Sequence, residues 1–271
     1  MSIGTRQHPS ETAGSGGPIR KLLRRLLPRD LRRALSRMGT NLTRRPPIGA
    51  VRFGSLRRLK PISSDWGFDR GTPIDRHYIE RFLEEEAPRI RGRVLEIDTN
   101  DYTLRFGGDR VRKSDVLHIA EMGPGVTLVG DLTSADHLPS EAFDCIIVTQ
   151  TLQLIYDVKA AITTIHRLLR PGGTALLTVP GMSPMTRDPD GEWGYYWGFT
   201  TLSARRLVGG IFGEDQVDVK SWGNVLSATA FLHGIAAGEL RASELEHRDP
   251  SFELLVTVRA VRGESGEQES R

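Results

Sequence analysis

The chain has 271 residues, of which 38% are hydrophobic and 26% charged, a balance that supports a sizeable folded core. No apolar stretch approaches the roughly 20 residues that a membrane-spanning helix needs. The single cysteine, Cys145, excludes an internal disulfide and a zinc site built on several thiolates, and it favours a reducing compartment.

The net charge of +3 conceals two segments of opposite sign. From Arg20 to Lys60 there are fourteen basic residues and one acid, Asp30, so this segment carries +13 and the rest of the chain −10. An acidic body is poorly suited to nucleic acid, because phosphate contacts need clustered lysines and arginines. The sequence therefore leaves only the basic segment for contact with a polyanion.

The first 60 residues differ in composition from the rest. Residues 1–18 are rich in Gly, Ser, Thr and Pro and are predicted to be disordered. Residues 19–60 are predicted to form a basic arm and linker, beginning with an amphipathic helix kinked at Pro28. Its apolar positions recur at three- and four-residue spacing: Ile19, Leu22, Leu23, Leu26, Leu27, Leu31, Leu35 and Met38.

Two interpretations of this basic helix stay open. In one, residues 19–40 bind an anionic membrane surface or a protein partner such as a glycosyltransferase; in the other, they pack on the chain's own domain with the arginines in water. Arg24 and Arg25 interrupt the apolar run and argue against a secretory signal, whereas a mitochondrial presequence is not excluded. We expect a cytoplasmic protein, peripheral at the inner face of the membrane.

Residues 61–262 show alternating helix and strand patterns and are predicted to form one domain, followed by a disordered tail at 263–271. A first helix is expected after Thr72, with Thr72 as its cap, and it should end near Pro88. Further helices are expected at 160–169 and from Thr200 or Thr201 to about residue 211. Strands are expected at 94–97, 115–119, 126–129, 143–148, 174–179, 216–221 and 254–261.

Alternating elements with continuously apolar strands predict an α/β fold, a doubly wound, mostly parallel sheet with helices on both faces. Ligands of such a sheet lie beyond the carboxyl ends of its strands. Acidic side chains near three of the first four strand ends disfavour a pyrophosphate and favour a ligand with hydroxyls, an amine or a sulfonium. They are Asp98, Asp101, Asp115 and Asp131. Neither G-x-G-x-x-G after the first strand nor G-x-x-x-x-G-K-[ST] occurs, which argues against dinucleotide and P-loop sites.

A series of motifs, in this order, resembles the class I S-adenosylmethionine-dependent methyltransferases over residues 70–260. It comprises Val94-Leu95-Glu96-Ile97, Gly130-Asp131-Leu132, Phe143-Asp144-Cys145-Ile146-Ile147 and Leu168-Leu169-Arg170-Pro171-Gly172-Gly173. The stretch from Asp65 to Arg76, with Tyr196-Trp197-Gly198-Phe199-Thr200, resembles a bacterial subgroup encoded with glycosyltransferases. The resemblance implies a Rossmann-like sheet of seven strands and S-adenosyl-L-methionine as cofactor.

The resemblance also implies roles for the matched positions. Glu96 would hold the first loop under the methionine end of the cofactor, and Asp115 would accept hydrogen bonds from the ribose hydroxyls. Asp131 would accept from the adenine amino group, with Leu132 packed near the ring. Gln150 would face the transferred methyl group. Further cofactor-binding candidates at the first strand end are Asp98, Asn100 and Tyr102.

Two segments depart from the family pattern. The first loop of the family is normally rich in glycine, whereas here it reads Asp98-Thr99-Asn100-Asp101-Tyr102. Asn and Asp tolerate left-handed backbone better than most residues, so such a turn can still form. After the fourth strand, Gln153 and Leu154 replace a frequent Glu-His pair, which removes a histidine general base.

The segment 182–200 is long, polar and aromatic. It is either a lid whose rings stack on a sugar or another flat acceptor, or a loop that packs Trp193 and Trp197 over the core. Candidate catalytic groups are Asp157 and Asp188 as bases and Tyr196 as a residue that orients the acceptor.

We therefore expect O-methylation of a small-molecule or carbohydrate acceptor in polysaccharide or natural-product biosynthesis, without a metal. The alternative is a methyltransferase-like domain without catalysis that serves as a partner or scaffold for a membrane-associated glycosyltransferase; the glycine-free first loop motivates it. A nucleic-acid methyltransferase that uses the basic arm is a third hypothesis, disfavoured by the acidic body.

Overall fold

The computed structural model describes residues 46, 49–121, 125–187 and 193–264. Internal contacts divide the chain between Arg57 and Arg58, and the architecture below is that of the second unit. The predictions for residues 1–18, for the basic helix at 19–38 and for Asp188 lie outside the described residues, as does most of the predicted tail. Within the described part, no helix has the length and apolar character needed to cross a membrane.

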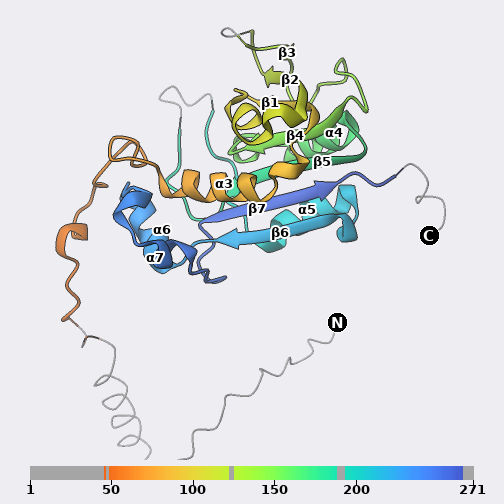
Figure 1. The fold of residues 1–271 in the computed structure, drawn as a ribbon. Coiled ribbons are helices and arrows are strands. Elements are labelled where there is room, and N and C mark those ends of the chain that lie inside the picture. Colours follow the sequence, from red (N-terminus) through yellow and green to blue (C-terminus); the bar gives the residue numbers. More distant parts are fainter. Residues whose placement is uncertain (1–45, 47–48, 122–124, 188–192, 265–271) are drawn as a thin grey trace, which may run out of the picture. The chain divides into compact units, whose positions relative to one another are not determined.

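In the described part of the chain, seven strands form one sheet in the order β3-β2-β1-β4-β5-β7-β6 (Figure 1). The first five strands pair in parallel, whereas β7 is antiparallel to both β5 and β6. The strands are β1 Gly92–Ile97, β2 Val111–His118, β3 Leu128–Val129, β4 Phe143–Thr149, β5 Leu169–Pro180, β6 Val217–Trp222 and β7 Leu255–Val261. This topology confirms the predicted doubly wound, mostly parallel sheet of seven strands.

Helices cover both faces of the sheet and create two apolar cores (Figure 1). One core contains α4 (Val158–Leu168) and α5 (Thr201–Phe212); the other contains α3 (Ile74–Glu85), α6 (Val225–Leu232) and α7 (Ala242–Glu246). Neighbouring strand residues point to opposite faces, so Ile146 joins the first core while Cys145 joins the second. Both faces of the central strands are therefore buried, which explains their continuous apolar runs.

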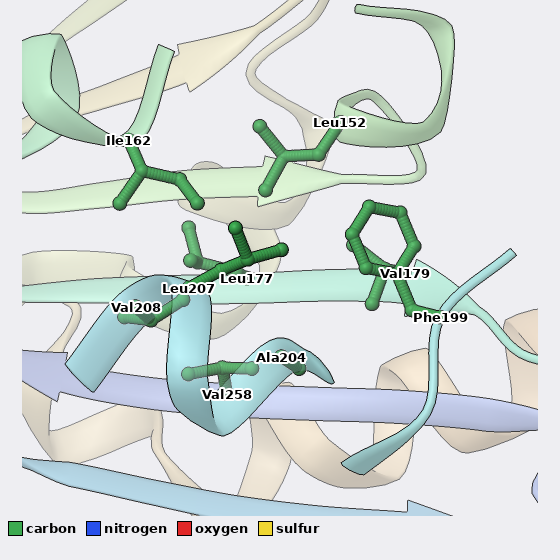
Figure 2. Close-up of a pocket in the computed structure, with 9 residues that line it drawn as sticks. All are labelled: Leu152, Ile162, Leu177, Val179, Phe199, Ala204, Leu207, Val208 and Val258. Carbon is green, nitrogen blue, oxygen red and sulfur yellow. The ribbon is translucent and has the colours of Figure 1, made fainter. Parts of the chain in front are cut away.

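The core between α4, α5 and the sheet is almost filled. Apolar side chains of α4, α5, β5 and β7 point toward one another there, as Figure 2 shows for Ile162, Leu177, Val208 and Val258. The space left among them is about 10 Å³ and its lining is apolar. Such a gap belongs to the packing of the core, because a ligand site needs far more room, roughly 300–1000 Å³.

Helix boundaries follow the local sequence in most places. The side chain of Thr200 accepts a hydrogen bond from the amide of Ser203 at the start of α5, so the predicted cap is confirmed. Thr72 is not the cap of α3, because the helix starts at Ile74 after Pro73 and no side chain caps it. Instead the Thr72 carbonyl accepts from the amide of Ala237, 2.8 Å away. The helices α6 and α7 were not predicted.

Candidate active site

The carboxyl ends of β1, β2, β3 and β4 open into one cavity of about 1180 Å³. A pocket for one small molecule typically measures roughly 300–1000 Å³, so this cavity is slightly larger than a usual single-ligand site. Residues from all four strand ends line it: Glu96, Ile97, Asp98, Thr99, Asp101, Tyr102, Leu117, His118, Ile119, Gly130, Asp131, Leu132, Thr149, Gln150 and Thr151.

Glu96 at the end of β1 fixes the loop that follows. Its side chain is buried, and one carboxylate oxygen accepts from the amide of Tyr102 at 3.2 Å. The other oxygen accepts from the amide and the hydroxyl of Thr103, both at 2.7 Å. Burial raises the pKa of Glu96, and the hydrogen bonds from Thr103 and Tyr102 oppose that rise. The loop is thus anchored from beneath by one carboxylate.

The glycine-free loop leaves the cavity open. Asp98 adopts the left-handed backbone with φ 75°, the conformation for which glycine is otherwise favoured. The amides of Asp98 and Thr99 donate to the carbonyls of Leu117 and Ile97, so the turn is tied to β2 and β1. A π-helical turn, Thr103–Gly107, then leads the chain away from the strand ends. An aspartate therefore makes the turn that a glycine would make.

Asp115 does not lie at the strand end, and its predicted contact with a ribose is wrong for this structure. It lies within β2, three residues before the strand ends at His118, and its register partner is Leu95 in β1. Its carboxylate is 2% exposed and bonds to Nε of Arg93 at 2.6 Å. It is absent from the residues that line the cavity. The carboxylate is a structural ion-pair partner inside the sheet.

His118 and Ile119 occupy the end of β2 in place of the expected carboxylate. The imidazole Nδ1 lies 3.0 Å from the amide nitrogen of Ala120, and Nε2 lies 3.7 Å from a carboxylate oxygen of Asp98. His118 is not among the residues predicted for the site, because the sequence does not define where the second strand ends.

The ends of β3 and β4 present the residues that the sequence predicted there. Asp131 lines the cavity, and its Oδ1 accepts from the amide of Thr133 at 2.8 Å, while Leu132 beside it is buried. Gln150 also lines the cavity, on left-handed backbone with φ 49°. Its Nε2 is buried and has no hydrogen-bond partner among the described residues. The Gln150 side chain instead accepts, through Oε1, from Nε2 of Gln153 at 3.3 Å.

Two of the other predicted site residues face elsewhere. Asn100 does not line the cavity, because its Nδ2 donates to the hydroxyl of Ser114 at 3.2 Å. Tyr196 is half exposed and packs edge-on against Tyr156, with 5.5 Å between ring centroids. Neither its ring nor its hydroxyl belongs to the cavity lining. The assignments of Asn100 to the cofactor and of Tyr196 to the acceptor are therefore corrected.

Asp157 caps a helix instead of facing the cavity. Its Oδ1 accepts from the amide of Ala160 at the start of α4, 3.0 Å away. Because the side chain is already used at the helix terminus and lies outside the cavity lining, its predicted role as a base is corrected. Asp188, the other candidate base, lies outside the described residues.

This capping role gives a direct expectation for Asp157. Asp157→Ala should lower the free energy of unfolding by about 1 kcal/mol, the usual cost of losing a side-chain cap. Urea denaturation measures that change, and calorimetric titration with S-adenosylhomocysteine should give the affinity of the unsubstituted protein. A variant of normal stability that has lost methyl transfer would instead support the catalytic role.

In the segment 182–200, the lid interpretation fits Trp193 and the packed-loop interpretation fits Trp197. Trp193 lines the cavity, as expected of a lid. Trp197 packs: its Nε1 donates to the carbonyl of Ile155 at 3.0 Å, and its ring stacks on Tyr156 at 6.0 Å. The aromatic segment thus supplies one cavity wall and one packed anchor.

The stretch before α3 and the first turn of that helix add lining residues that the sequence did not assign to a site. The amides of Ile62 and Ser63 both donate to the carbonyl of His233, which ties this stretch to the loop after α6. As a result Phe68, Thr72 and Arg76 line the cavity. These contacts join segments about 170 residues apart, so no local pattern in the sequence reveals them.

The charges and donors of the cavity fit S-adenosylmethionine. Among the described residues, five carboxylates line it against two arginines: Glu80, Glu96, Asp98, Asp101 and Asp131 against Arg76 and Arg105. The excess of negative charge favours a sulfonium and an amine. Gln150 and the carboxylate of Asp131 add polar side chains to the cavity lining at two strand ends.

Comparison with known proteins also indicates a methyltransferase domain. Residues 80–177 match a family described as methyltransferase domain. The chain is 29% identical over 102 residues to the ubiquinone/menaquinone biosynthesis C-methyltransferase UbiE of an Enterobacter species, covering 36% of this chain and 38% of that protein. The UbiE of Haemophilus ducreyi is 29% identical over 130 residues, covering 46% and 44%. The chain thus spans less than half the length of these relatives.

Among solved structures, an S-adenosylmethionine-dependent methyltransferase from Mesorhizobium loti is similar with a TM-score of 0.45 and 18% identity. The match covers 72% of this chain and 100% of that chain.

Proposed function

We propose that this chain, which carries a class I S-adenosylmethionine-dependent methyltransferase domain, transfers a methyl group to a small-molecule acceptor bound in the cavity. The observation that carries the proposal is the cavity itself: it lies at the carboxyl ends of four strands, is rich in carboxylates, and stays open although the first loop has no glycine. Its volume slightly exceeds that of a usual pocket for one small molecule.

Each strand end contributes a separate task. S-adenosylmethionine, when bound, supplies an electrophilic methyl group on a sulfonium centre. Asp131 accepts a hydrogen bond from the adenine amino group, and Leu132 packs beside the ring. Glu96 keeps the β1 loop in place under the methionine end through Tyr102 and Thr103. Gln150 at the end of β4 lines the cavity and faces the transferred methyl group, where the acceptor must be aligned.

The methylated atom is a finer part of the proposal. The sequence motifs favour an oxygen of a small molecule or sugar, whereas the two UbiE relatives are named C-methyltransferases. Transfer of a ¹³C-labelled methyl group distinguishes these outcomes, because an oxygen-bound methyl carbon resonates far downfield of a carbon-bound one. Attachment to a membrane or a glycosyltransferase through residues 19–40, and a place at the inner membrane face, stay proposals from the sequence alone.

Asp131→Asn tests the cofactor site. The asparagine keeps an oxygen that can accept from the amide of Thr133, so the turn survives. The adenine amino group then meets either the NH₂ group or an uncharged oxygen in place of a carboxylate oxygen, so binding weakens. We expect the affinity for S-adenosylhomocysteine, measured by calorimetric titration, to fall by about 10- to 100-fold, the value of one charge-assisted hydrogen bond.

Asp136→Asn is the matched control. Asp136 is an exposed acid in the same loop and does not line the cavity, so its variant should bind as the unsubstituted protein does. Equal affinities of both variants would contradict the adenine site at Asp131. A folded protein that binds neither S-adenosylmethionine nor S-adenosylhomocysteine would favour the scaffold alternative over an enzyme.

A further inference from the structure

Arg76 is a cation in the cavity wall without an acidic partner. It lies in the first turn of α3, is half-buried and lines the cavity. Among the described residues no carboxylate oxygen lies within 4.0 Å of its guanidinium nitrogens, the limit for a salt bridge. Nη1 donates to the hydroxyl of Tyr102 at 3.0 Å, and Tyr102 belongs to the loop after β1. The guanidinium is thus aimed at the β1 end of the cavity.

The other arginine that lines the cavity, Arg105, has an acidic partner. Arg105 is 57% exposed and pairs with Glu80 at 2.8 Å. Arg76 feels the charges of Asp75 and Glu80 as well, but among the described residues it forms no salt bridge, so its guanidinium keeps donors for a ligand.

The groups around the β1 end make Arg76 the point where an anion is held. Several amides of the loop are already used: those of Tyr102 and Thr103 donate to Glu96, and that of Asp98 donates to Leu117. The side chains of Glu96, Asp98 and Asp101 repel a negative group. An anion that enters this end of the cavity therefore gains most by contact with Arg76.

We propose that Arg76 is the anion-binding residue of the cavity and that it holds a carboxylate group; the inference rests on the proposed function. A planar guanidinium matches a carboxylate through two parallel hydrogen bonds. Tyr102 accepts from one edge of Arg76 and so orients the plane. The carboxylate has two sources, the methionine end of the cofactor or an acidic acceptor.

Calorimetric titration separates the two sources. S-adenosylhomocysteine and its decarboxylated counterpart are titrated into the full chain and into Arg76→Gln, Arg76→Lys and Arg81→Gln. Benzoate, a minimal aromatic acid, is titrated in the same series with and without S-adenosylhomocysteine. Arg81 is the matched control, because it lies on the same helix, is exposed and does not line the cavity.

If the cofactor supplies the carboxylate, Arg76→Gln weakens binding of S-adenosylhomocysteine by about 10- to 100-fold and leaves the decarboxylated compound unchanged. If the acceptor supplies it, S-adenosylhomocysteine binds all variants equally while Arg76→Gln loses benzoate. In either case Arg76→Lys recovers part of the loss and Arg81→Gln shows none.

Two results would overturn the inference. One is Arg76→Gln binding both S-adenosylhomocysteine and benzoate as the unsubstituted protein does. The other is equal loss of S-adenosylhomocysteine and its decarboxylated counterpart, which would indicate a structural role. Failure of the proposed function looks different: the folded, unsubstituted protein then binds neither nucleoside compound, and the benzoate titration still tests Arg76.

Discussion

Replacing Asp115 by alanine is expected to lower the free energy of unfolding by about 3 kcal/mol, through loss of a buried partner of Arg93. The Asp115 side chain is 2% exposed and that of Arg93 26%, so the arginine would be left with a charge poorly reached by water. The guanidinium carbon of Arg93 also lies 4.7 Å from the ring centroid of Phe143, which holds it in the sheet. Urea denaturation measures the loss.

The pH dependence of this effect has a defined sign. Burial acts to raise the pKa of Asp115, but the hydrogen bond and charge of Arg93, with Lys113, outweigh it and lower the pKa below 3.8. A depressed native-state pKa stabilises the fold above the unfolded-state value, and this contribution is lost as pH falls through the native-state pKa. The difference between the unsubstituted protein and Asp115→Asn should therefore shrink only below about pH 4.

Lys113→Ala is the control for Asp115→Ala. Lys113 also lies near Asp115, at 3.3 Å, but it is 59% exposed. An exposed ion pair contributes about 0–1 kcal/mol, so this variant should unfold almost as the unsubstituted protein does. An Asp115→Ala protein of normal stability that binds S-adenosylhomocysteine poorly would contradict the structural role and restore the ribose contact.

Glu96→Ala is expected to abolish measurable binding of S-adenosylhomocysteine and to destabilise the fold by about 3 kcal/mol. The change leaves the amides of Tyr102 and Thr103 and the Thr103 hydroxyl without their acceptor in a site where Glu96 is 1% exposed. Each buried group left unsatisfied costs about 1–3 kcal/mol. The loop would then lose the conformation that keeps the β1 end of the cavity open.

Two milder variants grade this effect. Thr103→Val removes the hydroxyl bond and keeps both amide bonds, so it should retain most of the affinity. Glu96→Gln keeps one acceptor oxygen and should fall between the two. Calorimetric titration gives the affinities, and hydrogen exchange at the amides of Tyr102 and Thr103 reports the loop directly. A Glu96→Ala protein that binds S-adenosylhomocysteine normally would contradict the anchoring role.

The sequence by itself determined the architecture, because it depends on local patterns. Continuous apolar runs such as Cys145–Val148 specify strands buried on both faces, and their alternation with amphipathic helices specifies a parallel sheet. The same logic placed Asp131, Leu132 and Gln150 beside the cavity, since each directly follows a strand whose end is clear in the sequence. The cap of α5 was narrowed to Thr200 or Thr201 for the same reason, and the structure selects Thr200, whose partner Ser203 is three residues away.

Only the tertiary structure decided which side chains share the cavity. The sequence analysis placed Asp115 wrongly because the ends of β2 depend on its register with β1. The short change from polar to apolar residues along β2 does not define that register. Asp157 and Tyr196 have suitable chemistry but point to a helix terminus and to another ring. Arg76 enters the cavity because its helix packs against the sheet after a stretch held by the loop at His233. Such placements arise from contacts between distant segments, and the direction of a side chain follows from packing that no local pattern contains.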